Sequence, residues 1–379
     1  MSRAVSVLFY MILAFITCVM ATNVKPVTAG RGTDAYYRRC AVNHVYIAGI
    51  FVILFIVSAL RFDIGNDYAQ YTLTAHEAYV GGYVVTEAGF NILVKLVYTL
   101  FNREYYEIVF ALFAIVTLVL FLRVFDRDSV NFSQSFFLFM TLGLYFQTFN
   151  TVRYYFALSV ALCSMRYVLE KDYIRFVFWI VCAAFFHKSV LLVIPVYFVA
   201  MFAWKWWIYV LGLVVGALCF AGQSFLLKLA LVLYPSYKDT IYLEGGISLI
   251  SVFRIFAVFV LYLWFMCYMG SEFSNHEDYQ KIRFYGQLNF LAFLAATFFS
   301  FLPVVTRIVY YFSVSQLLMI PLMIQNIEDD AVKLKLKLIV TVVCIIYFAL
   351  FLLNAHQAGV GLLPYRTWLF EEGYRYLYE

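Results

Sequence analysis

Long apolar runs separated by short polar segments make up most of the chain. Eleven runs come close to the roughly 20 residues that a helix needs to cross the hydrocarbon core of a bilayer. They are residues 4–22, 43–60, 104–125, 132–149, 151–169, 174–200, 203–221, 247–269, 284–302, 304–326 and 335–354. Two more runs, 83–101 and 223–234, are shorter or more mixed and predict tilted, re-entrant or interfacial helices. The pattern predicts an all-α polytopic membrane protein with about 11–12 transmembrane helices.

Composition narrows the class further. Of the 379 residues, 65% are hydrophobic and only 13% are charged, whereas soluble domains carry about 25% charged residues. The runs are continuous rather than alternating, which excludes a β-barrel. A net charge of +5 indicates short basic loops and no nucleic-acid partner. The seven Cys form no CxxC pair, so neither a disulfide framework nor a metal site is expected.

The first run, 4–22, follows Arg3 as in a signal peptide but is longer than the usual apolar core, so a retained span is expected. Residues 1–379 then form a single polytopic domain. Lys and Arg cluster in five short loops: 23–42, 123–131, 170–175, 270–283 and 326–337. All five face the cytoplasm if 83–101 does not cross and 223–234 does. The outer segments are then 61–82, 235–246, the 302–304 turn and 355–379, together with the N-terminus.

The segment 61–97 mixes carboxylates with aromatic rings. Asp67 and Glu87 lie among Tyr68 and other tyrosines. Acidic side chains accept hydrogen bonds from sugar hydroxyls, and rings cover the apolar face of a pyranose. On composition alone, a solvated loop with interfacial tyrosines is the simpler interpretation. We treat 61–103 and 235–250 as the functional outer-side segments.

Several arginines lie on the predicted outer side, against the positive-inside trend. Arg153 ends the stretch Asn150-Thr-Val-Arg and Arg307 follows Pro303, while Arg61 and Arg254 flank other outer segments. Each could be an interfacial side chain that extends to the membrane surface. As a group they fit an anionic, membrane-borne substrate such as a lipid diphosphate, because guanidinium binds phosphate oxygens bidentately and stays charged at low dielectric.

His187 and Lys188 interrupt the apolar run 174–200. In a continuous helix His187 lies about eleven residues, or roughly 16 Å, from the start, near mid-depth. A buried imidazole there needs a partner or a hydrated cavity. A packing role is the alternative, and an early end to the helix would lower the cost of both side chains.

Four short elements in order resemble the EpsG-like branch of Wzy-type polysaccharide polymerases. They are Arg61…Gly65-x-Asp67-Tyr68 with Glu87-x-Gly89, then Asn150-x-x-Arg153, Phe186-His187-x-Ser189 and Arg307-x-x-x-Tyr311. The resemblance spans about residues 45 to 370. Tyr154 stands where the family pattern often has Gln, which leaves the local contacts of Arg153 open.

The resemblance implies a bacterial inner-membrane glycosyltransferase with GT-C-like architecture and a site facing the periplasm. It implies polyprenyl-diphosphate-linked oligosaccharides as donor and acceptor, no metal or other cofactor, and a chain-length regulator protein as a candidate partner. His187 is the preferred base over Asp67 and Glu87. Arg153 and Arg307, then Arg61 and Arg254, bind the diphosphate, and Tyr68 and Asn150 contact sugar. A flippase of the same lipid-linked oligosaccharide, or a scaffold without a reaction, are the alternatives.

Overall fold

The computed structural model describes the chain except for residues 29, 85, 234–247, 303–304, 358–359 and 370–379. It is 77% helical, and the described residues form no strand, only an isolated bridge between Arg61 and Thr367. The chain forms two compact units. The first unit holds residues 1–163, 182–188 and 324–379, and the second holds 164–181 and 189–323. The single domain predicted for residues 1–379 stays a prediction.

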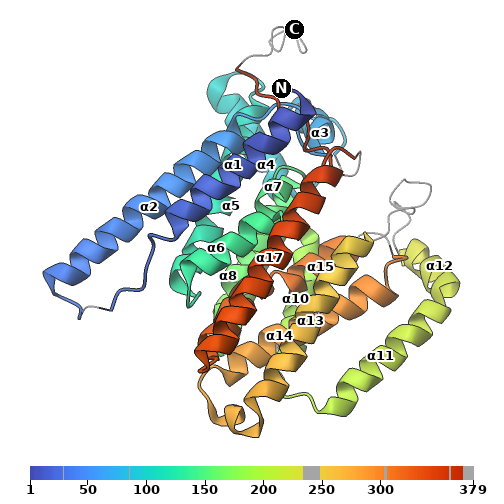
Figure 1. The fold of residues 1–379 in the computed structure, drawn as a ribbon. Helices are drawn as coiled ribbons and strands as arrows, with labels where there is room; N and C mark the ends of the chain where they lie inside the picture. The colour runs from blue at the N-terminus through green and yellow to red at the C-terminus, as the bar shows by residue number, and fades with distance from the viewer. Residues whose placement is uncertain (29, 85, 234–247, 303–304, 358–359, 370–379) are drawn as a thin grey trace. The chain divides into compact units, whose positions relative to one another are not determined.

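Helices from both ends of the chain build the first unit (Figure 1). Its main helices are α1 (Arg3–Ala21), α2 (Asp34–Ala59), α5 (Tyr106–Arg127), α6 (Phe132–Thr141), α7 (Leu144–Gln147), α17 (Asp330–Asn354) and the part of α8 (Val152–Leu169) up to Cys163. α2 packs against α5, and α6 contacts both α1 and α17. Ser2, Thr33 and Asp329 begin α1, α2 and α17 by accepting hydrogen bonds from first-turn N–H groups, which otherwise lack a partner.

The segment 61–82, expected to be an outer loop, contains a helix. α3 (Tyr68–Val80) ends at Gly81, whose positive φ of 83° suits glycine, and pairs with α4 (Ala88–Phe101). The two helices bury aromatic rings against α5, which gives the hairpin its core. This aromatic cluster includes Tyr68, Tyr71, Phe90, Phe110 and Phe113. The loop interpretation was wrong because tertiary packing of these rings, not local hydropathy, stabilises α3.

The C-terminal segment 360–369 returns to the start of the α3–α4 hairpin. The N–H of Phe62 donates to the carbonyl of Arg366 at 3.0 Å. The hydroxyl of Tyr365 donates to the carbonyl of Val57, and that of Tyr10 donates to the carbonyl of Leu362, each at 3.0 Å. The segment therefore joins α1, α2 and the α3–α4 hairpin, a contact that the sequence did not predict.

The second unit is arranged around α14 (Tyr279–Phe298), which contacts α10 (Val193–Met201), α11 (Trp206–Ala221), α13 (Leu249–Met269) and α15 (Val305–Ser313). Its remaining elements are most of α9 (Tyr173–Ala184), η1 (Lys188–Leu192), α12 (Gln223–Leu233), η4 (Ser271–Asn275) and α16 (Gln316–Asn326). The amide of Asn289 on α14 donates to Ser315 at 2.8 Å, which satisfies two buried polar groups.

The protein is an all-α polytopic membrane protein. Six helical stretches in the described part of the chain are long and apolar enough to cross a bilayer, or seven if α11 and α12, bent by 79°, form one span. The sequence predicted eleven full spans. Three of these runs are divided into separate helices: 132–149 at Gly143, where φ is +74°, 174–200 after Ala184, and 304–326 after Ser313. The last still counts as one of the six stretches. α8 and α14 are long enough but more polar than the six.

Candidate functional site

The run 174–200 is interrupted where its polar residues lie. α9 ends at Ala184, and η1 starts at Lys188. The continuous helix expected across His187 was therefore wrong. The interruption frees backbone groups that need partners. The N–H of Lys188 donates to Glu87 at 3.1 Å, and the carbonyl of Phe185 accepts from the N–H of Gly89 at 2.9 Å. Residues at the start of α4 thus provide hydrogen-bond partners for the backbone groups between α9 and η1.

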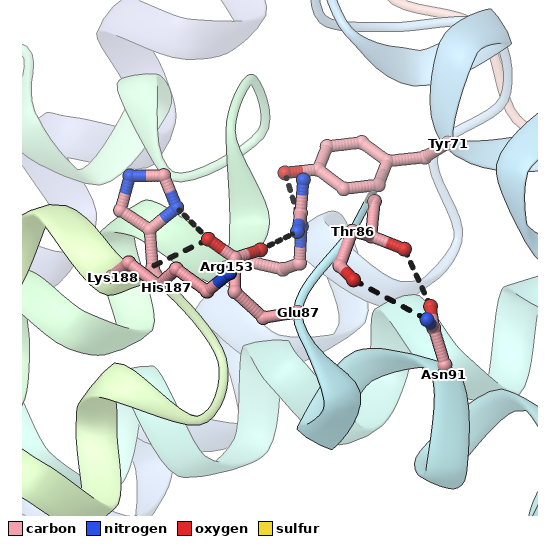
Figure 2. A network of polar contacts seen from close by, with 7 residues as sticks. All are labelled: Tyr71, Thr86, Glu87, Asn91, Arg153, His187 and Lys188. Atoms are coloured by element: carbon pink, nitrogen blue, oxygen red, sulfur yellow. Dashed lines mark hydrogen bonds and ion pairs between the residues drawn. The ribbon is translucent and has the colours of Figure 1, made fainter. Parts of the chain in front are cut away.

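Glu87, which immediately precedes α4, is the centre of a polar network (Figure 2). One carboxylate oxygen pairs with Nη1 of Arg153. The other accepts from the Lys188 N–H and lies 3.7 Å from Nδ1 of His187. Since the Glu87 side chain is only 14% exposed, its charge is balanced inside the protein by Arg153 rather than by water.

The guanidinium of Arg153, in the first turn of α8, is contacted by aromatic rings on its faces and by polar groups along its edge. Its guanidinium lies over the rings of Tyr71 and Phe90, 5.2 and 5.1 Å from their centroids, and Nε donates to the Tyr71 hydroxyl at 3.3 Å. Stacking and pairing together fix the guanidinium plane. Nη2 makes no hydrogen bond to any described residue, so this nitrogen can still bind an anion.

His187 is buried, with 7% of its side chain exposed, and its ring packs edge-on against Tyr154 with centroids 5.5 Å apart. Tyr154, which departs from the family pattern, therefore contacts the imidazole. The Lys188 side chain is exposed, so only its backbone takes part in the network.

Direct contacts join the first two sequence motifs. The N–H of Asn66 donates to Oδ1 of Asn150 at 2.9 Å, and the hydroxyl of Thr151 donates to Asp67 at 2.7 Å. Gly65 has a φ of +105°, and a Cβ there would lie 2.3 Å from the Phe149 carbonyl, so only glycine fits. Asp67 and Asn150 thus hold the α3–α4 hairpin on the start of α8. The Tyr68 ring is 5% exposed, inside the aromatic cluster.

The other predicted cations are placed elsewhere. Arg61 is in the core of the first unit, and burial lowers its pKa from the ordinary value to about 10, which leaves it protonated at neutral pH. Arg254 and Arg307 belong to the second unit. Arg254 is buried over the Tyr310 ring, and Arg307 is half-buried in the first turn of α15. Most of the predicted segment 235–250 lies outside the described residues.

The last two motifs also meet each other. The hydroxyls of Ser189 and Tyr311 lie 3.2 Å apart, and Tyr197 donates to the Tyr311 carbonyl at 2.9 Å. Contacts within the units therefore join the first motif to the second and to His187 of the third, and join Ser189 of the third to the fourth.

The EpsG family model matches residues 44–367, which is most of the chain. The chain belongs to the EpsG family. EpsG proteins form a Wzy-like polysaccharide polymerase family, so lipid-linked oligosaccharides and membrane lipid are the substrates and surroundings that the family implies. No curated protein and no solved structure matches the chain.

Within this EpsG protein, two residues of the site were not predicted from the sequence. Phe90, which stacks on Arg153, gave no signal because one Phe in an apolar helix is ordinary. Thr151 was overlooked, although it lies inside the Asn150-x-x-Arg153 element. The available signal was a hydroxyl within an element that already carries an amide and a cation.

Gly89 offers a test of the contact between α4 and the break. A Cβ at this position would lie 2.7 Å from the Phe185 carbonyl oxygen, so Gly89→Ala should push α4 away from residues 185–188. We expect a loss of about 1–3 kcal/mol in the free energy of unfolding, together with a lower rate of chain extension. Thermal unfolding and an extension assay measure both.

Gly222→Ala is the matched control for that substitution. Its added Cβ would make only ordinary contacts, 3.5 Å or more from neighbouring atoms. A Gly89→Ala protein as stable and active as this control would show that the close approach of α4 to the break has no role.

Proposed function

We propose that this EpsG protein is a metal-independent glycosyltransferase of the bacterial inner membrane. It transfers a polyprenyl-diphosphate-linked glycan chain onto a lipid-linked repeat unit at the periplasmic face. The observation that carries the proposal is the buried contact of Glu87 with both Arg153 and His187. The contact supports the proposal because an imidazole that could act as a base lies near a fixed guanidinium, and displacement of a diphosphate requires both kinds of group.

His187 is the proposed base. As the acceptor hydroxyl attacks the anomeric carbon of the donor, its proton passes to the imidazole and the bond from sugar to diphosphate breaks. Glu87 faces Nδ1, so Nε2 is the nitrogen proposed to take the proton. Glu87 and Asp67 are weaker candidates, because the first is paired with Arg153 and the second with Thr151. Glu87 is thus proposed as a positioning residue.

The leaving diphosphate carries the electron pair away and needs preorganised cations. Arg153 can offer Nη2 without giving up Glu87. Arg307 in the second unit is the second proposed ligand of the diphosphate. Arg254 is a weaker candidate, because its side chain is buried. Sugar contacts of Tyr68 and Asn150 stay predictions, since the ring is in the aromatic cluster and the amide binds Asn66. A chain-length regulator as partner and a GT-C-like architecture also stay predictions.

Reconstitution with purified lipid-linked repeat units tests the function. Wild-type protein should form longer lipid-linked chains and release polyprenyl diphosphate. Arg153→Gln should lower the extension rate by about 10²- to 10³-fold, because one preorganised donor to the developing charge is lost. Arg307→Gln should also lower the rate.

The matched control is Arg166→Gln. Arg166 lies on the same helix but is 39% exposed and pairs with Glu170 one turn away, so its loss should leave the rate unchanged. Movement of intact units across the bilayer without chain growth would instead favour a flippase. Normal chain growth in Arg307→Gln would remove Arg307 from the mechanism.

A further inference from the structure

Arg61 is a buried cation that the proposed reaction does not need. Its side chain lies between the end of α2 and the aromatic cluster, and the residue is 2% exposed. The guanidinium carbon lies 5.0 Å from the Phe110 ring centroid and 5.2 Å from that of Phe149. Nη1 donates to the carbonyl and to the hydroxyl of Ser58. The guanidinium therefore packs against two aromatic rings and is hydrogen-bonded along one edge inside the first unit.

The opposite edge is unsatisfied. Nε and Nη2 are buried and have no hydrogen-bond partner, and Arg61 has no ion pair in the described part of the chain. Nε–H and one Nη2–H point in the same direction and form the fork with which arginine binds anions. A buried charge of this kind is costly without a counter-charge.

A pocket lies against this side chain, lined by Arg61, Ser58, Thr117, Thr148 and apolar residues that include Phe113 and Val152. Its hydroxyls are not equivalent. Thr148 donates to the Tyr145 carbonyl, so its hydrogen is already used. The hydroxyl of Ser58 accepts from Arg61 and can rotate to donate, as can that of Thr117. Two N–H groups and two hydroxyls can thus donate into one pocket.

We propose that this pocket is a binding site for a small monovalent anion, chloride, held by Nε and Nη2 of Arg61 and by the hydroxyls of Ser58 and Thr117. Donors outnumber acceptors there, which suits an anion better than water. The free space admits about one water-sized particle, which matches a halide and not a diphosphate. The anion neutralises Arg61 and so stabilises the junction of α2, α5 and the C-terminal segment. This assigns Arg61 a ligand other than the diphosphate expected from the sequence.

Purified full-length protein tests the site without any activity measurement. Replacing isethionate by chloride at constant ionic strength should raise Tm by about 2–4 °C, because the anion binds only the folded state. Thr117→Val keeps the volume and removes one donor, so it should reduce this shift, and Arg61→Gln should abolish it. Arg366→Gln, which removes an exposed arginine paired with Asp63, is the control and should keep the full shift.

Crystals grown in bromide provide a direct readout. An anomalous peak within hydrogen-bond distance of Nε and Nη2 would support the site even if Arg61→Gln fails to fold. A wild-type Tm that is the same in chloride and isethionate, with no bromide peak, would overturn the proposal. It would equally be overturned if Arg61→Gln folds and loses binding of polyprenyl diphosphate while Thr117→Val keeps the full chloride shift.

Discussion

Replacing His187 by glutamine is expected to lower the rate of chain extension by about 10²- to 10⁴-fold. Glutamine keeps a polar side chain of similar length at the break between α9 and η1 but cannot take a proton from the acceptor hydroxyl. The backbone contacts of the break come from Phe185 and Lys188, so the fold and the amount of protein in the membrane should be preserved. The measurement is the rate of polymer formation by reconstituted protein, with KM for the lipid-linked acceptor expected to change little.

His76→Gln is the matched control for that experiment. His76 on α3 also faces a carboxylate, with Nδ1 3.0 Å from Glu104, but its side chain is 41% exposed. The control should extend chains at the wild-type rate. If His187→Gln also extends at the wild-type rate, the base is another group, and Asp67→Asn becomes the next variant to measure.

Replacing Glu87 by alanine is expected to lower the free energy of unfolding by about 3 kcal/mol and to stop chain extension. The change leaves the largely buried Arg153 without its carboxylate and the Lys188 N–H without an acceptor. Removal of one member of a buried ion pair typically costs 3–5 kcal/mol, and we take the lower end because both side chains are 14% exposed. Thermal unfolding in detergent measures the stability.

A second substitution separates the stability effect from the chemical one. In the Glu87→Ala background, Arg153→Met removes the unpaired charge and keeps apolar contact with Tyr71 and Phe90, so part of the lost stability should return. Chain extension should stay absent, because both polar groups are gone. Glu104→Ala is the control, expected to cost less than about 1 kcal/mol at a more exposed pair. A Glu87→Ala protein as stable as wild type would show that the ion pair does not stabilise the first unit.

The class of the protein and its family could be read from the sequence. Long apolar runs indicate helices that cross a lipid bilayer, because a helix satisfies its own backbone hydrogen bonds where no water is present. The order of short elements around Asp67, Arg153, His187 and Arg307 was sufficient to indicate the family to which the chain belongs. Most residues of the polar network could also be selected from the sequence, because charged side chains are rare in or beside such apolar runs.

The partners of those charges were decided by the tertiary structure. Glu87 is 66 residues from Arg153 and 101 from Lys188, and no local pattern encodes a contact at such separation. Hydropathy likewise predicted a continuous helix over 174–200, because it scores how apolar a run is and not whether its backbone finds partners elsewhere. The break is possible only because Glu87 and Gly89 satisfy the freed groups. For the same reason Arg61 and Arg153, both predicted from the sequence to be outer-side arginines that bind the diphosphate, differ in the fold. Packing buries Arg61 beside hydroxyls and pairs Arg153 with a carboxylate.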